Sequence, residues 1–306
     1  MSKVYSERIR ATEPKPNATQ SETDGWGPNS KSLIPDSLGI EFLLRCLSVP
    51  RPATPDSQLY TPHWPEVLAL ADKRYLTPLL YKRLKESGVQ TPVPADVCER
   101  LRPVHVASAV SSMSFLGTLR KVLQRLRSSG INVIVLKGAY VAGAVYGDDA
   151  LRPMVDVDLM VPRADMLRAC SVLLEIGQSH LQLTDIESHC RKRHHLPAVV
   201  INNRVGIELH WNIVPPVGPV KIDAAGLWER ACPALKAGVE VQALSPEDLL
   251  LHLCVHASYS DGFKGGLRSI CDVAATIQRF SDDMDWPRVV ERAREWRAAR
   301  HVGRTL

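Results

Sequence analysis

The spacing of apolar residues divides the 306-residue chain into four segments. Residues 1–35 have no periodic apolar face and are rich in Pro, Ser, Thr and Asn, which predicts a disordered tail. Residues 36–128 and residues 216–306 carry apolar positions at helical spacing. Between them, residues 129–215 combine β-type apolar runs with helical patterns. Strands and helices in close succession predict an α/β (α+β) core, flanked by an N-terminal and a C-terminal helical segment.

The core segment contains several runs that predict strands. Residues 131–136 form an apolar, β-branched run, and a helical pattern of small residues follows it. Two later runs, 196–201 and 205–211, flank the pair Asn202 and Asn203. Two asparagines between β-type runs are typical of a hairpin turn. We therefore expect a hairpin late in the core.

Another apolar run carries two acids in alternation, in the order Asp156, Val157, Asp158, Leu159. On a strand, alternate side chains share a face, so the two aspartates point one way and the apolar pair points toward a core. Two carboxylates at this spacing repel each other, and a hard divalent cation such as Mg²⁺ relieves the repulsion. The alternative is a surface strand with two solvated acids. Because Asp is depleted in strands and its neighbours here are apolar, the pattern favours a metal site.

A third candidate acid lies in the run at 205–211. Glu208 and His210 share one face of this strand, and Ile207 and Leu209 share the other. If the two acidic strands are neighbours in the sheet, Glu208 lies beside the aspartates. The alternative is a solvated glutamate on an exposed strand face.

Three stretches of the chain together resemble a known family. They are LKGAYVAGAVYGDDALRPMVDVDLMV, HHLPAVV and IELHW, and the resemblance covers about residues 129–211 well. The chain resembles the family called uncharacterised nucleotidyltransferase, within the polymerase-β-like nucleotidyltransferase superfamily. The resemblance implies a mixed sheet in which a strand, a glycine turn and a helix precede the strand with Asp-x-Asp, and a third acid stands on a later strand.

The resemblance also implies an activity and its cofactor. Members of the superfamily move a nucleoside monophosphate (NMP) from a nucleoside triphosphate (NTP) to an acceptor and release pyrophosphate. Asp156, Asp158 and Glu208 then correspond to the catalytic acids and to the ligands of Mg²⁺ (or Mn²⁺). The acceptor is unknown and could be a small molecule, a protein or RNA.

The turn after the first strand supplies candidate nucleotide-binding residues. Gly138 lets the backbone approach phosphates, and the helix that follows favours negative charge at its N-terminus. Lys137 and Arg152 are candidate phosphate partners. The alternatives are a strand-end lysine that extends to solvent and a surface loop arginine. The superfamily usually has Gly-Ser at this turn, and here the residues are Lys137-Gly138-Ala139.

Two other functions are compatible with the same fold. The chain could be a non-catalytic module that binds a nucleotide or a partner, or a component of a toxin–antitoxin type of system. The presence of all three acids favours an enzyme over a module that has lost its catalytic residues.

The histidines offer weaker alternatives for a metal site. His252 and His256 lie four residues apart, as on one face of a helix, but residue 253 is leucine and not the glutamate of a zinc protease motif. Buried or hydrogen-bonded histidines explain them better. His194 and His195 could contact a phosphate or the substrate, since the resemblance includes this pair.

Composition and charge indicate which partners and which cellular location to expect. The net charge of +5 is compatible with nucleotides or RNA. No apolar run approaches the roughly 20 residues that a membrane span needs, and the N-terminus lacks the apolar core of a secretory signal. Seven scattered cysteines without a CxxC pair indicate reduced thiols. We therefore expect a cytoplasmic protein that does not bind membranes.

Overall fold

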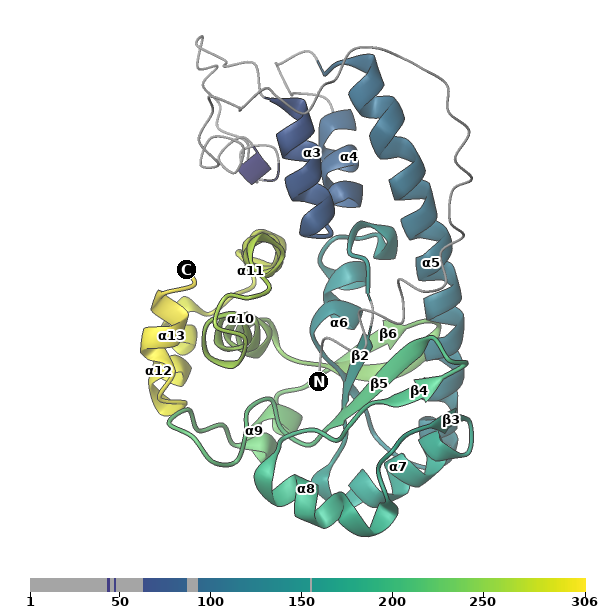
Figure 1. Ribbon diagram of the computed structural model, residues 1–306. Helices are drawn as coiled ribbons and strands as arrows, with labels where there is room; N and C mark the ends of the chain where they lie inside the picture. The colour runs from purple at the N-terminus through teal and green to yellow at the C-terminus, as the bar shows by residue number, and fades with distance from the viewer. Residues whose placement is uncertain (1–42, 45–46, 48–62, 87–92, 155) are drawn as a thin grey trace. The chain divides into compact units, whose positions relative to one another are not determined.

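The computed structural model of the chain describes residues 43–44, 47, 63–86, 93–154 and 156–306 (Figure 1). These residues belong to one compact unit, Asp36–Leu306. The prediction of a disordered tail over 1–35 lies outside the described residues. The boundaries predicted at 128/129 and 215/216 stay predictions.

Between residue 63 and the sheet, the described part of the chain forms the helices α3 (Trp64–Lys73), α4 (Thr77–Lys85) and α5 (Ala95–Ser128). Both α3 and α4 have proline in their first turn, where no backbone N–H is needed. The helical conformation is interrupted between them at Tyr75, whose φ is 56°. Buried leucines and Trp64 join α3, α4 and the start of α5 in a hydrophobic cluster of their own.

Seven strands form one mixed sheet in the order β3-β4-β5-β2-β1-β7-β6. The pairs β2–β5 and β1–β7 are parallel, and the other neighbours are antiparallel. This confirms the predicted α/β class with a mixed sheet. The strands are β1 (Ile134–Val135), β2 (Asp156–Met160), β3 (Gly177–Gln178), β4 (Val199–Ile201), β5 (Val205–His210), β6 (Cys232–Lys236) and β7 (Val239–Ala243).

Short helices alternate with the strands, and a helical segment follows the sheet (Figure 1). One 3₁₀ turn, η1 (Asp149–Leu151), matters for the site, and a π-helical turn, η4 (His256–Ser260), extends α10. The helices are α6 (Lys137–Ala144), α7 (Met166–Leu174), α8 (Ile186–Lys192), α9 (Ala224–Glu229), α10 (Pro246–Val255), α11 (Leu267–Phe280), α12 (Trp286–Glu295) and α13 (Ala299–Gly303).

The alternation along the strands separates two hydrophobic layers. Val157 and Leu159 of β2 belong to a cluster with residues of α5 and α7 on one face of the sheet. Met160 belongs to a second cluster with residues of α10, α12 and α13 on the other face. Because side chains alternate, Asp156 and Asp158 lie on the Met160 face. The acids therefore face the side of the sheet that α10 covers.

Several local predictions are confirmed. Asn202 and Asn203 both have positive φ, 52° and 53°, and join β4 to β5 as a tight hairpin. Among the described residues, no helix is both long enough and apolar enough to span a bilayer.

Other elements were not predicted. The strands β3 and β6 and the helix α8 have no counterpart among the elements that the sequence predicted. Through β6 and β7, the sheet continues beyond residue 215, where the predicted core segment ends.

Candidate active site

The register of two parallel strands brings the predicted acids together. Asp158 of β2 pairs directly with Glu208 of β5, and Asp156 pairs with Gly206. Paired strands lie about 4.8 Å apart, so the side chains of Asp158 and Glu208 are neighbours on one face. Asp156, two residues before Asp158, shares this face and is solvent-exposed. The structure therefore gathers the three acids that the sequence singled out.

Asp158 is the buried member of this group, and two basic side chains hold it. Its Oδ1 accepts a hydrogen bond from Nζ of Lys137 at 3.0 Å and lies 2.8 Å from Nε2 of His210. Burial alone would raise the pKa of the Asp158 carboxyl. The positive charge of Lys137 and the hydrogen bond from His210 outweigh burial, so this pKa lies well below its usual range. Asp158 is thus a fixed carboxylate anion.

Lys137 reaches Asp158 from a strained position. It lies at the junction of β1 and α6 with a φ of 43°, a region that lysine rarely adopts. Burial lowers its pKa, but the adjacent Asp158 raises it more, and the net pKa is raised. The ammonium therefore stays charged, and its partner in this structure is a carboxylate.

Asp156 has the opposite electrostatic character. Partial burial of its carboxyl, together with the negative charges of Asp158 and Glu208, raises its pKa to about 6. Lys137 and Arg152 act in the other direction and do not offset this repulsion. The face of the sheet that carries Asp156, Asp158 and Glu208, called the acid face below, thus combines a carboxyl of raised pKa with one of lowered pKa.

Glu208 lies between two histidine rings. Its Oε2 is 3.5 Å from Nδ1 of His195 and 3.7 Å from Nε2 of His210. Burial raises the pKa of Glu208, but His210 and His195 together lower it by a larger amount. The net pKa is therefore lowered. Within the described part of the chain, His195, Glu208 and His210 are the three potential metal ligands whose donor atoms converge within 4.8 Å. Asp156 and Asp158 are not in this group.

The sequence held a signal for one of these histidines. His210 shares a strand face with Glu208, which the alternation already indicated. The family resemblance singled out His195 only as a possible phosphate or substrate contact, and an isolated antiparallel bridge to His210 brings it beside Glu208. Its ring stacks on that of His210, with centroids 5.0 Å apart.

Arg152 and Gly138, both predicted to bind nucleotide, contact each other. The Arg152 guanidinium forms an ion pair with Asp272 of α11 at 2.8 Å, and the Tyr146 hydroxyl donates to the same carboxylate at 3.0 Å. A Cβ atom at position 138 would lie 2.6 Å from Cζ of Arg152. Glycine at 138 therefore makes room for this guanidinium. The role of both residues toward a nucleotide stays a prediction.

A second arginine, which the sequence did not indicate, belongs to the same region. The guanidinium of Arg268 lies over the Tyr75 ring, 5.4 Å from its centroid. Burial and the positive charge of Arg152 lower its pKa, whereas the charges of Asp272 and Asp156 oppose the shift. Among the described residues, no carboxylate lies within ion-pair distance of Arg268. It is a cation available to a ligand.

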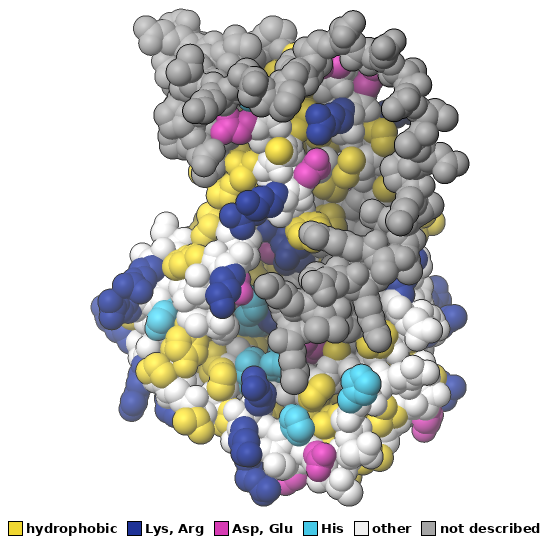
Figure 2. All heavy atoms as spheres, in the orientation of Figure 1, with side chains coloured by type: hydrophobic (Ala, Val, Ile, Leu, Met, Phe, Trp, Pro, Cys, Tyr) yellow, Lys and Arg dark blue, Asp and Glu magenta, His cyan; other side chains and the backbone are white. Residues whose placement is uncertain are grey.

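Histidines gather around this face of the sheet, and Figure 2 shows them (cyan) on the lower half of the molecule. His252 of α10 is fully buried, and neither of its ring nitrogens has a hydrogen-bond partner among the described residues. Burial and the charge of Lys137 hold its pKa well below the usual value. His252 is therefore a neutral core histidine. In the described part of the chain, no third ligand joins His252 and His256.

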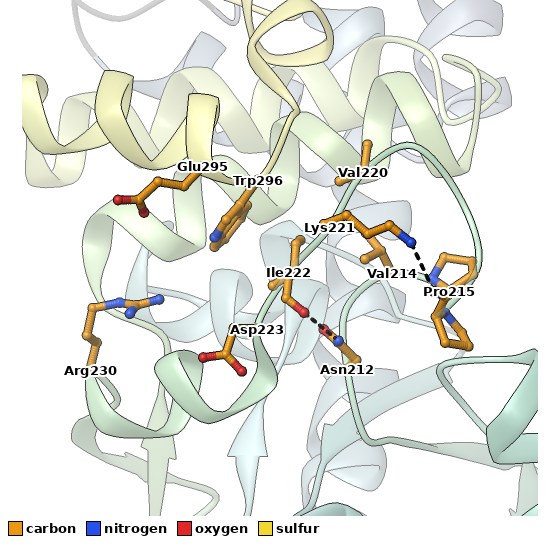
Figure 3. Close-up of a pocket in the computed structure, with 11 residues that line it drawn as sticks. Asn212, Val214, Pro215, Val220, Lys221, Ile222, Asp223, Arg230, Glu295 and Trp296 are labelled. Atoms are coloured by element: carbon orange, nitrogen blue, oxygen red, sulfur yellow. Dashed lines mark hydrogen bonds between the residues drawn. The ribbon is translucent and has the colours of Figure 1, made fainter.

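A cavity of about 440 Å³ lies beyond the end of β5. Asn212, Lys221, Arg230 and Trp296 are among the residues that line it, and Asn212 donates to the Ile222 carbonyl oxygen at 2.9 Å (Figure 3). None of the three acids lines this cavity. Its lining residue Asn212 follows the end of β5 at His210 closely along the chain.

Three solved structures are similar to this chain. The solution structure of the antibiotic-resistance factor ANT(2'')-Ia is similar at 13% identity, over 63% of this chain and 99% of that chain, with a TM-score of 0.42. The crystal structure of ANT(2")-Ia with adenylyl-2"-tobramycin gives 14% identity, the same coverage and a TM-score of 0.39. An antigenic nucleotidyltransferase-like protein from Paracoccidioides brasiliensis gives 15% identity, over 62% of this chain and 93% of that chain, with a TM-score of 0.33.

No curated protein sequence matches the chain. A family profile does match, over residues 61–306, and its description is "Uncharacterised nucleotidyltransferase". The match spans most of the chain and includes every residue of the acid face. This chain therefore belongs to the uncharacterised nucleotidyltransferase family.

Proposed function

We propose that the chain moves an NMP from an NTP to an acceptor hydroxyl and releases pyrophosphate. The observation that carries this proposal is the pairing of Asp158 with Glu208 across two parallel strands, with Asp156 on the same face. Family membership supports nucleotidyl transfer in general. The acid face is the place that we propose for the reaction.

The acid face suits a divalent metal ion. Asp156, Asp158 and Glu208 offer only oxygen atoms, which Mg²⁺ and Mn²⁺ prefer. Burial and the neighbouring acids together raise the pKa of Asp156, and a bound cation would relieve the repulsion among the acids. These three residues would hold Mg²⁺ (or Mn²⁺). When bound, the metal supplies positive charge to the triphosphate and to the acceptor oxygen.

The basic residues have separate tasks. Lys137 and His210 fix the orientation of Asp158, because both contact the same carboxylate oxygen. Arg268 provides a half-buried positive charge for the phosphates, and Arg152 supports the turn at Gly138. The N-terminus of α6 adds backbone N–H groups that favour an anion.

The reaction follows from these positions. The acceptor oxygen forms a bond to the α-phosphorus, and the bond from that phosphorus to the bridging oxygen of the leaving group breaks. Pyrophosphate departs with the electron pair, and the acceptor proton passes to water. Charge builds up on the phosphoryl oxygens, so positioning and positive charge account for most of the catalysis.

The test is a transfer assay with an unbiased acceptor pool. The full chain is incubated with each NTP labelled in its α-phosphate, with Mg²⁺ or Mn²⁺, and with cell extract. Products are then separated into protein, RNA and small-molecule fractions. We expect the label in one fraction and pyrophosphate release in equal amount.

Two variants make the assay specific. Asp156→Asn should lose labelling, because it removes an exposed ligand of the metal. Asp283→Asn changes an exposed acid far along the chain in a turn and should label like the wild-type protein. Equal labelling by the wild-type and Asp156→Asn proteins would contradict the proposed function.

A further inference from the structure

Two histidines and one glutamate converge beside the acid pair. Glu208 and His210 share a face of β5, and His195 pairs with His210 through a backbone bridge. His210 is buried, with 1% of its side chain exposed, whereas His195 and Glu208 each keep 28% exposed. The group thus has a rigid inner member and an opening toward solvent.

The distances among the donor atoms fit a small tetrahedral ion. The two ring nitrogens lie 3.5 Å and 3.7 Å from the same oxygen of Glu208. Four ligands bound at zinc–nitrogen distances of about 2.0–2.1 Å lie about 3.4 Å from one another. Both observed separations are longer than a normal hydrogen bond and close to the spacing of ligands around such an ion. The third separation, between the two ring nitrogens, is within 4.8 Å, so the rings have to move closer to each other to surround an ion.

Binding an ion here replaces two existing contacts. Nε2 of His210 lies 2.8 Å from Asp158, and Nδ1 of His195 lies 3.1 Å from the carbonyl oxygen of Leu196. In each neutral ring, the proton moves to the other nitrogen when the first becomes a metal ligand. Nδ1 of His210 is already buried without a partner among the described residues. The number of unpaired ring atoms at His210 therefore does not increase.

The donor set selects the kind of metal. Mg²⁺ prefers oxygen, whereas imidazole nitrogen suits zinc and its neighbours in the first transition row. Two histidines and one glutamate also leave one position of a tetrahedral ion open, as in catalytic zinc sites. An open position lets a substrate oxygen bind.

We propose that His195, Glu208 and His210 bind a transition-metal dication of the zinc class. This position lies beside the oxygen-only position at Asp156 and Asp158 and shares Glu208 with the acid face. Its open coordination position would take the acceptor oxygen. That role in transfer rests on the proposed function, whereas binding of the metal does not.

The first test measures metal binding without any nucleotide. The full chain is treated with a chelator, and Zn²⁺ or Co²⁺ is then titrated in a large excess of Mg²⁺. Calorimetry gives the stoichiometry and affinity, and the Co²⁺ absorption spectrum reports nitrogen ligands. We expect one equivalent with the spectrum of a four-coordinate, nitrogen-bound ion. No binding, or a spectrum of oxygen ligands alone, overturns the proposal.

Variants then locate the bound ion. His195→Ala removes a half-buried ligand at the surface opening, and we expect the affinity for Zn²⁺ to fall by about 100-fold or more. His180→Ala is the matched control, because His180 is exposed, and it should bind like the wild-type protein. Unchanged affinity in His195→Ala overturns the proposal, provided that circular dichroism shows a folded chain. Asp156→Asn should keep the affinity for Zn²⁺, and an equal loss there would place the ion among the acids instead.

The two proposals fail in different ways. If Zn²⁺ binding depends on His195 but no nucleotidyl transfer occurs, the metal site is supported and the proposed function is refuted. If transfer needs Mg²⁺ and Asp156 but no Zn²⁺ binds, the metal site is refuted and the proposed function is supported.

Discussion

Two buried aspartates of this protein have contrasting surroundings. Asp248 of α10 accepts from Nε of Arg230 at 2.9 Å with one oxygen and from Nη1 of Arg292 at 2.8 Å with the other. Asp158 of β2 uses a single oxygen for both Lys137 and His210. At Asp248, two cations surround one anion.

Around Asp158, the balance of charge is reversed, because Asp156 and Glu208 add two further carboxylates. Burying an unpaired charge is costly, so a structural ion pair is expected to satisfy both of its members. The cluster at Asp248 meets that condition. At the acid face, two further carboxylates share the surroundings of Asp158, and we propose that a bound cation offsets their repulsion. The comparison thus separates an ion pair that supports the fold from the site that is proposed to bind a ligand.

The largest loss of stability is expected when the charge of Asp248 is removed. Asp248→Asn leaves Arg292 buried without its counter-charge, and we expect a loss of about 3–5 kcal/mol in the free energy of unfolding. Urea denaturation measures it. The transfer rate per folded molecule should not change, because Asp248 lies outside the acid face. Denaturation at the wild-type urea concentration would mean that Arg230 and Arg292 find other partners.

The second prediction concerns Asp156→Asn, which should lower the transfer activity without lowering stability. Asp156→Asn should reduce transfer by at least about 100-fold, as expected for loss of a metal ligand. In metal-free buffer at pH 7, its melting temperature should hold or rise. The folded-state pKa of Asp156 is raised from 3.8 to about 6, so its ionisation weakens the folded state increasingly as the pH rises through this range. Asparagine removes that penalty. A melting temperature several degrees lower would show that the Asp156 charge is already compensated.

The smallest change in stability is expected at an exposed ion pair, which serves as a reference for the other two predictions. Arg127 and Glu240 form an exposed ion pair, with Nη2 2.5 Å from Oε2 and side chains 58% and 75% exposed. Water solvates both groups, so Arg127→Ala should change the free energy of unfolding by less than about 1 kcal/mol. The same urea experiment measures it. A loss as large as that of Asp248→Asn would refute burial as the cause of the contrast.

The acid face was predictable because its information is local. Asp156 and Asp158 alternate with apolar residues, and a period of two fixes their common face whatever the sheet around them. Glu208 shows the same pattern on its own strand. What the pattern cannot give is the neighbour of each strand, which the sheet order supplies.

The parts that were missed depend on distant or weak signals. Arg152 meets Asp272 across 120 residues, and no local pattern links them. The strand β6 is mostly exposed at the edge of the sheet and begins with Cys232-Pro233, so it lacks an apolar alternation. The helix α8 has only seven residues and buries only Ile186 and Cys190. Each is defined by its tertiary contacts.

The distance along the chain between β2 and β5 also has a consequence for synthesis. His210 follows Asp158 by 52 residues, which corresponds to about 3–10 seconds of translation at typical rates of 5–20 residues per second. Lys137 precedes Asp158 by 21 residues and is therefore made first. Of the two basic partners of Asp158, the lysine is therefore synthesised before the aspartate and the histidine after it.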